Sequence, residues 1–265
     1  MDSIYDQGYG ASIRSRMDVW NGGDMAEPAT SHTAPERNVT LPPGQYRIEG
    51  FPRFGAHLHQ PPPEVPDDPR LEITGAVRGP TTVALTELAS LPHREIVADL
   101  HCVAGWSATG LRWGGVAFSD LYYTLIEPSV RSGTTITHVV FEGLDGYRSV
   151  ALLEDVLADD VTIADRLDGQ PLEPKHGAPV RLVSPGQYGF ISTKHLCRIE
   201  VCDTEPNVRY HPSLLVHLGL QMVKPHRRAR AAYEERHRYL PAWLARPIYH
   251  RLVPAIRRRR ASSDH

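Results

Sequence analysis

The sequence has few cysteines and no long hydrophobic run. Three cysteines among 265 residues, unevenly spaced, exclude a disulfide framework and favour a reducing compartment. No stretch approaches the ~18 consecutive apolar residues that a membrane-spanning helix requires. Because residues 1–20 also lack the apolar core of a secretion signal, we expect a cytoplasmic protein.

Net charge is also small, at −2, but the charge is unevenly distributed. Residues 221–260 contain twelve Lys or Arg and two Glu, a net charge of +10, so the remainder carries −12. Such a basic tail either lies across the acidic body of its own chain or of a twin subunit, or docks to an anionic membrane surface or an acidic protein. No recognition motif accompanies the charge, so a nucleic-acid partner is not expected.

The apolar content of the chain is sufficient for a globular fold. The hydrophobic fraction is 41%, and short apolar strand patterns that alternate with short helical ones predict an α+β fold with mixed sheets. We expect an N-terminal extension over 1–45, one domain over 46–205 and a basic tail of short helices over 206–265. The predicted strands span 71–77, 95–100, 135–142, 147–152 and 161–166, hairpin turns are predicted at 145–146 and 168–169, and helical turns at 87–90 after Thr86, at 120–126 after Ser119 and at 153–157.

One cysteine lies in a setting that suits chemistry. The stretch DLHCVAGWSATGLRW, residues 99–113, places Cys102 at the end of an apolar run and at the start of a glycine- and serine-rich turn. Glycines in and after this turn let a backbone approach a ligand closely. A free cysteine is commonly a small buried hydrophobe. The pattern alone therefore allows either a core residue or a thiolate ligand for a soft metal.

A second stretch, residues 175–201, places positive charge inside an apolar pattern. Arg181 lies in the strand-like run VRLV, where an unpaired charge would be costly, so we expect a buried anionic partner for it. Ser192, Thr193 and Lys194 offer backbone N–H groups, hydroxyls and an ammonium group to an anion. Because Arg and Lys are suited to bind phosphate, this stretch predicts a phosphate-binding element.

Together the two stretches resemble the sulfite oxidase superfamily, the proteins with an oxidoreductase molybdopterin-binding domain. The resemblance covers roughly residues 50–203. It is closer to the bacterial methionine-sulfoxide-reductase type of catalytic subunit than to sulfite oxidase proper, which continues into an immunoglobulin-like domain that a basic tail cannot supply. The matching residues are CVAGWS from Cys102, WGG from Trp113 and HGAPVRL from His176, followed by Tyr188, Gly189 and Lys194.

The resemblance implies a molybdenum–molybdopterin cofactor. It makes Cys102 the protein ligand to molybdenum and the catalytic residue. It also implies cofactor contacts from an aromatic-Arg-x-His element ahead of the first domain strand and from the second stretch. The residues carried over for cofactor binding are Arg53, Phe54, His57, His176, Arg181, Ser192, Thr193 and Lys194.

The implied function is two-electron oxygen-atom transfer on a small substrate, served by a separate electron-transfer partner. Sulfite oxidases follow the ligand cysteine with arginines that hold the anion, whereas residues 103–111 carry no charge here, so a sulfoxide- or N-oxide-like substrate is favoured over sulfite. Two alternatives stay open: a catalytically silent molybdopterin-binding or carrier protein, and a thiol enzyme in which Cys102 acts with His101 or His176. Neighbouring strand residues face opposite ways, so His101 should point away from Cys102.

Overall fold

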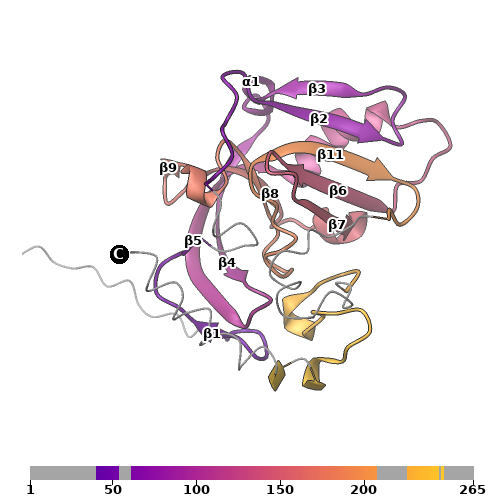
Figure 1. Cartoon of the computed structure of the whole chain (residues 1–265). Helices are drawn as coiled ribbons and strands as arrows, with labels where there is room; N and C mark the ends of the chain where they lie inside the picture. The colour runs from indigo at the N-terminus through magenta and orange to yellow at the C-terminus, as the bar shows by residue number, and fades with distance from the viewer. Residues whose placement is uncertain (1–39, 54–60, 208–225, 245, 248–265) are drawn as a thin grey trace, which may run out of the picture. The chain divides into compact units, whose positions relative to one another are not determined.

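The strands of the described chain form two mixed β-sheets, and short helical turns connect some of them (Figure 1). The structure is a computed structural model that describes residues 40–53, 61–207, 226–244 and 246–247. The predicted α+β class is confirmed. Within this described part, no helix is both long enough and apolar enough to cross a membrane. Most of the predicted extension, residues 1–39, lies outside it.

The six-stranded sheet is built around the hairpin of β4 and β5. Its order is β1-β5-β8-β10, with β4 also paired to β5 and β9 to β8. The short β1 runs parallel to β5, and the other pairs are antiparallel. The strands are β1 Tyr46–Arg47, β4 His93–His101, β5 Trp106–Ala117, β8 Thr162–Leu167, β9 Gln170–Pro171 and β10 Arg181–Val183.

The five-stranded sheet has the order β3-β2-β11-β6-β7, and only the β2–β11 pair is parallel. Ile73, Ile199 and Val201 lie on its buried face, as the two-residue period of a strand requires. The predicted strands 71–77, 135–142 and 147–152 are confirmed with small shifts at their ends, as β2 Arg70–Gly75, β6 His138–Gly143 and β7 Arg148–Leu152. The sheet also contains β3 Thr81–Ala84 and β11 Leu196–Cys202.

The helices are single turns, α1 Leu85–Leu88, α2 Phe118–Leu121 and α3 Leu153–Val156, and α2 continues as a π-helical turn, Tyr122–Ile126. The predicted N-caps Thr86 and Ser119 are wrong. The capping positions are Ala84 and Ala117, and neither makes a side-chain cap hydrogen bond. Each helix begins directly where a strand ends, because an apolar residue such as the fully buried Phe118 turns into the core at that point. The hydroxyl residue therefore falls inside the first turn.

The predicted hairpin turns are confirmed, and their sequences explain them. Asp168 and Gly169 both have positive φ, at 52° and 79°, which is the geometry that favours Asp-Gly in a two-residue turn between β8 and β9. Gly146 also has positive φ, 74°, in the turn before β7. These turns fix the register of the strands that they join.

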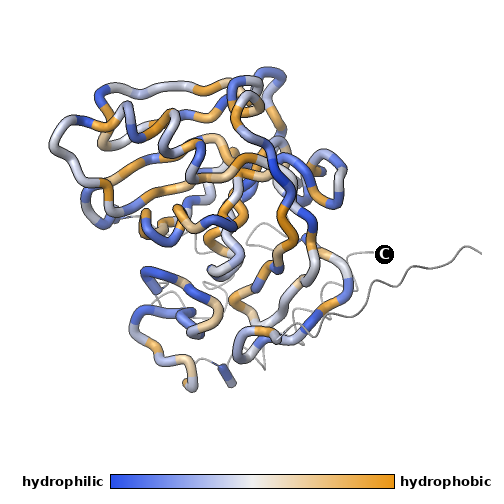
Figure 2. Tube along the Cα trace, turned by 180° about the vertical axis from the view of Figure 1, so that it is seen from behind, coloured by the Kyte–Doolittle hydropathy of each residue, from blue (hydrophilic) through white to orange (hydrophobic). Residues whose placement is uncertain are grey.

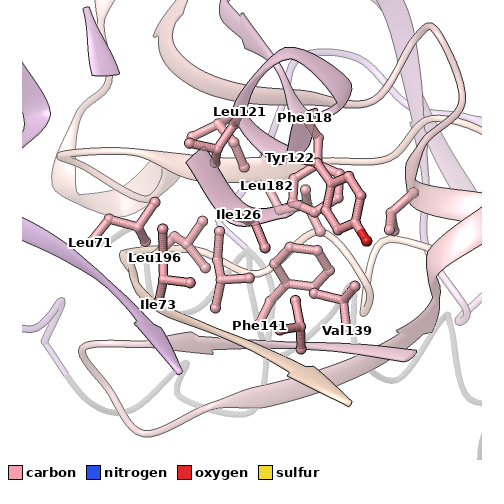
Figure 3. Packing of buried hydrophobic residues seen from close by; sticks show 14 of the residues in the cluster. Leu71, Ile73, Phe118, Leu121, Tyr122, Ile126, Val139, Phe141, Leu182 and Leu196 are labelled. Carbon is pink, nitrogen blue, oxygen red and sulfur yellow. The ribbon is translucent and has the colours of Figure 1, made fainter. Parts of the chain in front are cut away.

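The main hydrophobic core lies between the five-stranded sheet and the helical turn that follows β5 (Figure 3). Phe118 meets Phe141 of β6 edge to face, with ring centroids 5.4 Å apart. A second cluster surrounds the β4–β5 hairpin and includes Cys102, Trp106 and Trp113. The cysteine therefore belongs to a separate, smaller apolar group, beside the hairpin that carries it.

The C-terminal segment, residues 226–238, packs on the domain although it is mainly hydrophilic (Figure 2). The Tyr188 N–H donates to Ala229 O at 2.8 Å, and the Ala231 N–H donates to Gly186 O at 3.0 Å. Both alanines are buried. Backbone hydrogen bonds and small side chains thus hold the segment close to the loop that follows β10.

Ion pairs add to this attachment. Arg228 lies 2.6 Å from Asp155 and 2.8 Å from Glu154, and Arg238 pairs with Glu205. In this part of the tail, basic residues meet carboxylates of their own chain, which is one of the two arrangements weighed from the sequence. The remainder of the predicted tail lies outside the described residues.

Candidate active site

Cys102 lies in the tight turn that joins β4 to β5. This cysteine turn, residues 102–105, is closed by two backbone hydrogen bonds: Cys102 N–H donates to Trp106 O at 2.8 Å, and Gly105 N–H donates to Cys102 O at 2.9 Å. Gly105 has φ +97°, a backbone conformation that residues other than glycine rarely adopt. The glycine therefore allows the sharp reversal that places the thiol at the end of the hairpin.

The Cys102 thiol is almost fully buried, with 6% of the residue exposed. Burial raises its pKa to about 12, against the opposing effects of the Ala104 N–H, 3.5 Å from Sγ, and of the charges on Arg236 and Lys194. The free thiol is therefore protonated at neutral pH and is a poor nucleophile. A bound metal ion would deprotonate it, because a coordinated thiol is ionised outright.

Arg181 of β10 carries a buried guanidinium group. Nη1 donates to His176 O at 2.9 Å and Nη2 donates to Ser192 O at 3.0 Å, while the group stacks over Trp113 at 5.1 Å. Burial lowers its pKa to about 9. Within the described residues, no carboxylate pairs with Arg181. The anionic partner that the sequence predicts is thus not supplied by this part of the protein, and a bound anion would provide it.

Lys194 brings a second cation to the same region. Its Nζ donates to Lys175 O at 3.3 Å. Burial and the neighbouring charges of Arg181 and Arg53 lower its pKa to about 7, whereas Asp145 and Cys102 act in the opposite sense. Arg53, Arg181 and Lys194 form what we call the cation cluster. Like charges held together favour the binding of an anion, which relieves their repulsion.

His176 lies at the end of a 3-10 turn, Pro174–His176, and stacks on Phe51 with ring centroids 4.7 Å apart. Burial, together with the charges of Lys175, Lys194 and Arg181, lowers its pKa to about 4, so the ring is neutral at physiological pH. Its Nδ1 and the indole Nε1 of Trp113 are buried and have no hydrogen-bond partner among the described residues. A polar ligand would satisfy these two atoms.

Ser192 and Thr193 make internal hydrogen bonds in this structure. The Ser184 N–H donates to Ser192 Oγ at 3.1 Å, and Thr193 Oγ1 lies 2.7 Å from Ser149 Oγ. The Thr193 N–H donates to Ile191 O at 2.7 Å, so it is not available to an anion. Ser192 contributes instead through its carbonyl, which accepts from Arg181. Direct cofactor contact by these two residues stays a prediction.

The element before the first domain strand is described only in part. Arg53 is half-buried and lies close enough to Lys194 to lower the pKa of that residue. Phe54 and His57 lie outside the described residues. The aromatic residue that the structure places in the site is Phe51, which meets both His176 and Trp113. The sequence carries an aromatic residue on either side of Pro52 and Arg53, and the pattern alone selected only the second.

Two further candidate site residues cannot be identified from the sequence. Gln45 Nε2 donates to Cys102 O at 3.1 Å, and Arg236 Nη1 donates to Val103 O. Arg236 also stacks on the Tyr188 ring at 5.3 Å. Gln45 and Arg236 are far from Cys102 in sequence and belong to no motif, so only the folded chain reveals them.

The histidine beside the cysteine bonds elsewhere. His101 Nδ1 lies 2.8 Å from Ser107 Oγ, and burial lowers the pKa of the ring. Together with the raised pKa of the Cys102 thiol, this disfavours the thiol-enzyme alternative. A thiol nucleophile needs a base that takes its proton, and within the described residues the Cys102 thiol makes no hydrogen bond to His101 or His176.

Comparison with known proteins agrees with this geometry. Residues 58–210 match the family described as the oxidoreductase molybdopterin binding domain. The chain belongs to this family. It is therefore a molybdopterin-dependent oxidoreductase, and its cofactor is molybdenum–molybdopterin. Cys102, the cation cluster and His176 all lie inside the matched region or just before it.

Individual relatives cover different shares of the chain. The uncharacterized oxidoreductase YuiH of Bacillus subtilis is 30% identical over 57% of this chain and 72% of its own length. The mitochondrial sulfite oxidase of Rattus norvegicus is 29% identical over 69% of this chain but 39% of its own length. The protein-methionine-sulfoxide reductase catalytic subunit MsrP of Gluconobacter oxydans is 26% identical over 70% of this chain and 69% of its own length.

The residues in the site fit the cofactor that the family implies. A buried thiol suits a soft, redox-active metal. The cation cluster, with Arg181 buried and Arg53 and Lys194 partly buried, suits the phosphate of a pterin cofactor, since Arg and Lys bind such anions directly. The unpartnered Nδ1 of His176 and Nε1 of Trp113 lie on side chains grouped with Arg181 and Phe51, and they offer hydrogen bonds to a polar ring system.

Proposed function

We propose that the protein catalyses two-electron oxygen-atom transfer on a small, uncharged substrate of the sulfoxide or N-oxide class. The observation that carries this proposal is that the chain following the buried thiol of Cys102 offers no cation to a substrate. The cation cluster is assigned to the cofactor, and Arg236 donates to Val103 O and Gly44 O. Residues 103–111 supply no charged side chain. This arrangement offers little to hold an anionic substrate such as sulfite.

The chain's own residues then have distinct roles. Cys102 binds the metal through its thiolate, and the cation cluster and His176 hold the rest of the cofactor. When bound, the cofactor supplies the two-electron redox chemistry. Because the neutral His176 ring keeps a lone pair at physiological pH, it can accept or donate one hydrogen bond to the pterin. Burial of Cys102 would keep water away from a metal bound to its sulfur.

The electrons come from a separate protein partner in this proposal, because the sequence contains no second redox motif. The similarity to MsrP, whose name records reduction of a protein-bound sulfoxide, supports this direction of reaction more than the similarity to sulfite oxidase does. The sulfite oxidase match covers well under half of that relative's length, so its activity is not transferred here.

Redox cycling of the purified protein tests the proposal. The chain should be expressed in a host that makes the cofactor, reduced, and mixed with dimethyl sulfoxide, methionine sulfoxide, trimethylamine N-oxide or, after reoxidation, sulfite. We expect the optical spectrum of the metal centre to return to its oxidised form with a sulfoxide or N-oxide, and sulfite to cause negligible reduction. Fast reduction by sulfite would reverse the substrate assignment. A molybdenum-loaded protein that cycles with none of them would instead be a silent carrier.

A further inference from the structure

Three backbone carbonyls of the cysteine turn accept hydrogen bonds from two other segments of the chain. Cys102 O accepts from Gln45 Nε2, Val103 O accepts from Arg236 Nη1, and Gly105 O accepts from Tyr46 N–H. The donors lie in residues 44–48, which we call the N-terminal segment, and in the C-terminal segment, 226–238. Both segments lie outside the matched family region, 58–210. The turn that carries the metal ligand is therefore fixed by parts of the chain that the family domain does not include.

The N-terminal segment contacts the turn along its length. Tyr46 N–H donates to Gly105 O at 3.0 Å and Ile48 N–H donates to Ser107 O at 3.0 Å, so β1 continues the sheet past the turn. Ser107 Oγ also donates to Gln45 Oε1 at 3.1 Å. Gln45 thus uses both ends of its amide, one on the turn and one on β5, which fixes its orientation.

Arg236 joins the turn to both segments. Nη1 donates to Val103 O, Nη2 donates to Gly44 O at 3.4 Å, and the guanidinium stacks on Tyr188. The residue is 2% exposed. A planar guanidinium can bridge two carbonyls with separate N–H groups, which the single point charge of a lysine does less well. One side chain from the C-terminal segment therefore connects the cysteine turn with the N-terminal segment.

Two glycines show how closely these parts approach. Gly44 has φ +69°, and a Cβ there would lie 2.9 Å from Glu234 Oε1 and 3.1 Å from Arg236 Nη2. Gly105 has φ +97°, and a Cβ there would lie 3.2 Å from Gly44 O. The positive φ favours glycine at both positions, and the short distances show that the turn and the two segments are closely packed.

We propose that Arg236 is a positioning residue for Cys102, and that the C-terminal segment completes the metal site by holding the cysteine turn in its ligating conformation. This inference rests on the proposed role of Cys102 as metal ligand. Its first test is nevertheless independent of that role, because the hydrogen bonds of the turn exist in the polypeptide itself.

Amide hydrogen exchange of the full-length chain gives that first test. In Arg236→Gln and Arg236→Lys, the amides of Cys102 and Gly105 should exchange about tenfold faster than in the wild type, because the turn loses its bond to the C-terminal segment. The matched control is Arg228→Gln, which removes an ion pair between the same segment and Asp155 but does not touch the turn. It should leave the exchange of these two amides unchanged.

Molybdenum content gives the second test. In protein purified from a cofactor-producing host, both Arg236 variants should retain severalfold less molybdenum per chain than Arg228→Gln, and Arg236→Lys should not restore the wild-type content. Unchanged exchange at the turn in both Arg236 variants would overturn the inference, as would equal acceleration in Arg228→Gln. A wild-type chain without molybdenum would refute the proposed function and leave the exchange result to judge the positioning role.

Discussion

Charged side chains on the five-stranded sheet are matched with one another, whereas buried Arg181 of the six-stranded sheet has no carboxylate partner in the described residues. Arg198 lies 2.7 Å from Glu72 and 3.2 Å from Glu142, and Arg148 lies 3.2 Å from Glu142. These groups are partly exposed and satisfy one another across neighbouring strands. Arg181 is 1% exposed and bonds only carbonyl oxygens.

The difference distinguishes structural from functional charge. A partly exposed ion pair stabilises the fold slightly, and little free energy is lost in desolvating its charges. A buried cation without an anion is unfavourable by itself, so its presence indicates a ligand that arrives after folding. The buried thiol of Cys102 fits the same account, because it is protonated by itself and a bound metal would remove its proton. Each prediction below alters one side of this comparison.

The largest effect should come from Cys102→Ser. If the thiolate is the bond from protein to metal, turnover of a sulfoxide should fall by more than ~10³-fold. The domain should stay folded, because Ser replaces Cys with almost the same volume and the melting temperature should change by only a few degrees. Steady-state kinetics and thermal unfolding together check this. A variant with wild-type turnover would remove the thiol from the mechanism.

Arg181→Gln should lower the molybdenum content of the purified protein about tenfold, because the cofactor loses a charge-assisted contact. Elemental analysis per mole of chain measures this. Arg198→Gln is the matched control, since it removes an arginine of the paired set on the other sheet. Equal molybdenum loss in both variants would show that the effect comes from general destabilisation.

Lower pH should weaken the fold through buried histidines. Burial lowers the pKa of His176 and of His237 to about 4, below the ordinary 6.5. Between these values the unfolded chain binds protons that the folded chain does not, so the free energy of unfolding rises with pH and is lost as pH falls. From pH 7 to pH 5 each group should cost roughly 1–2 kcal/mol.

Urea unfolding of the cofactor-free chain at the two pH values measures this loss. His237→Gln removes one of the titrating rings, so the variant should lose less stability between pH 7 and pH 5 than the wild type. An identical pH dependence in both proteins would mean that His237 is not held neutral by the fold.

Arg198→Gln should have the smallest effect, a slight decrease in the free energy of unfolding. Its partners are partly exposed, with 37% and 21% of the Glu72 and Glu142 side chains accessible, so the free energy of unfolding should fall by less than about 1 kcal/mol. Added salt should reduce even this difference, because surface charges are screened. A loss of several kcal/mol would show that paired surface charge matters more here than the comparison of the two sheets implies.

Local patterns predict the strands and the cysteine turn. Strand periodicity and Asp-Gly pairs depend on neighbouring residues, so β6, β7 and the turn at Asp168 follow from the sequence. The predicted caps at Thr86 and Ser119 fail because burial of apolar residues, a property of the fold, sets where those helices begin.

Long-range contacts limit what the sequence reveals about the site. Arg181 stands out because a charge inside an apolar run is rare, and the structure shows it buried. Gln45 and Arg236 carry no such signal, since each is an ordinary polar residue in a polar stretch. Their contacts with the cysteine turn arise only when three distant segments meet.

X-ray absorption at the molybdenum edge tests the central claim most directly, because it counts the sulfur atoms bound to the metal. Wild-type protein and Cys102→Ser, both loaded with cofactor, should be compared under the same conditions. If Cys102 is the protein ligand, the wild type shows one more sulfur atom around molybdenum than the variant. The same number of sulfur ligands in both proteins would contradict the account.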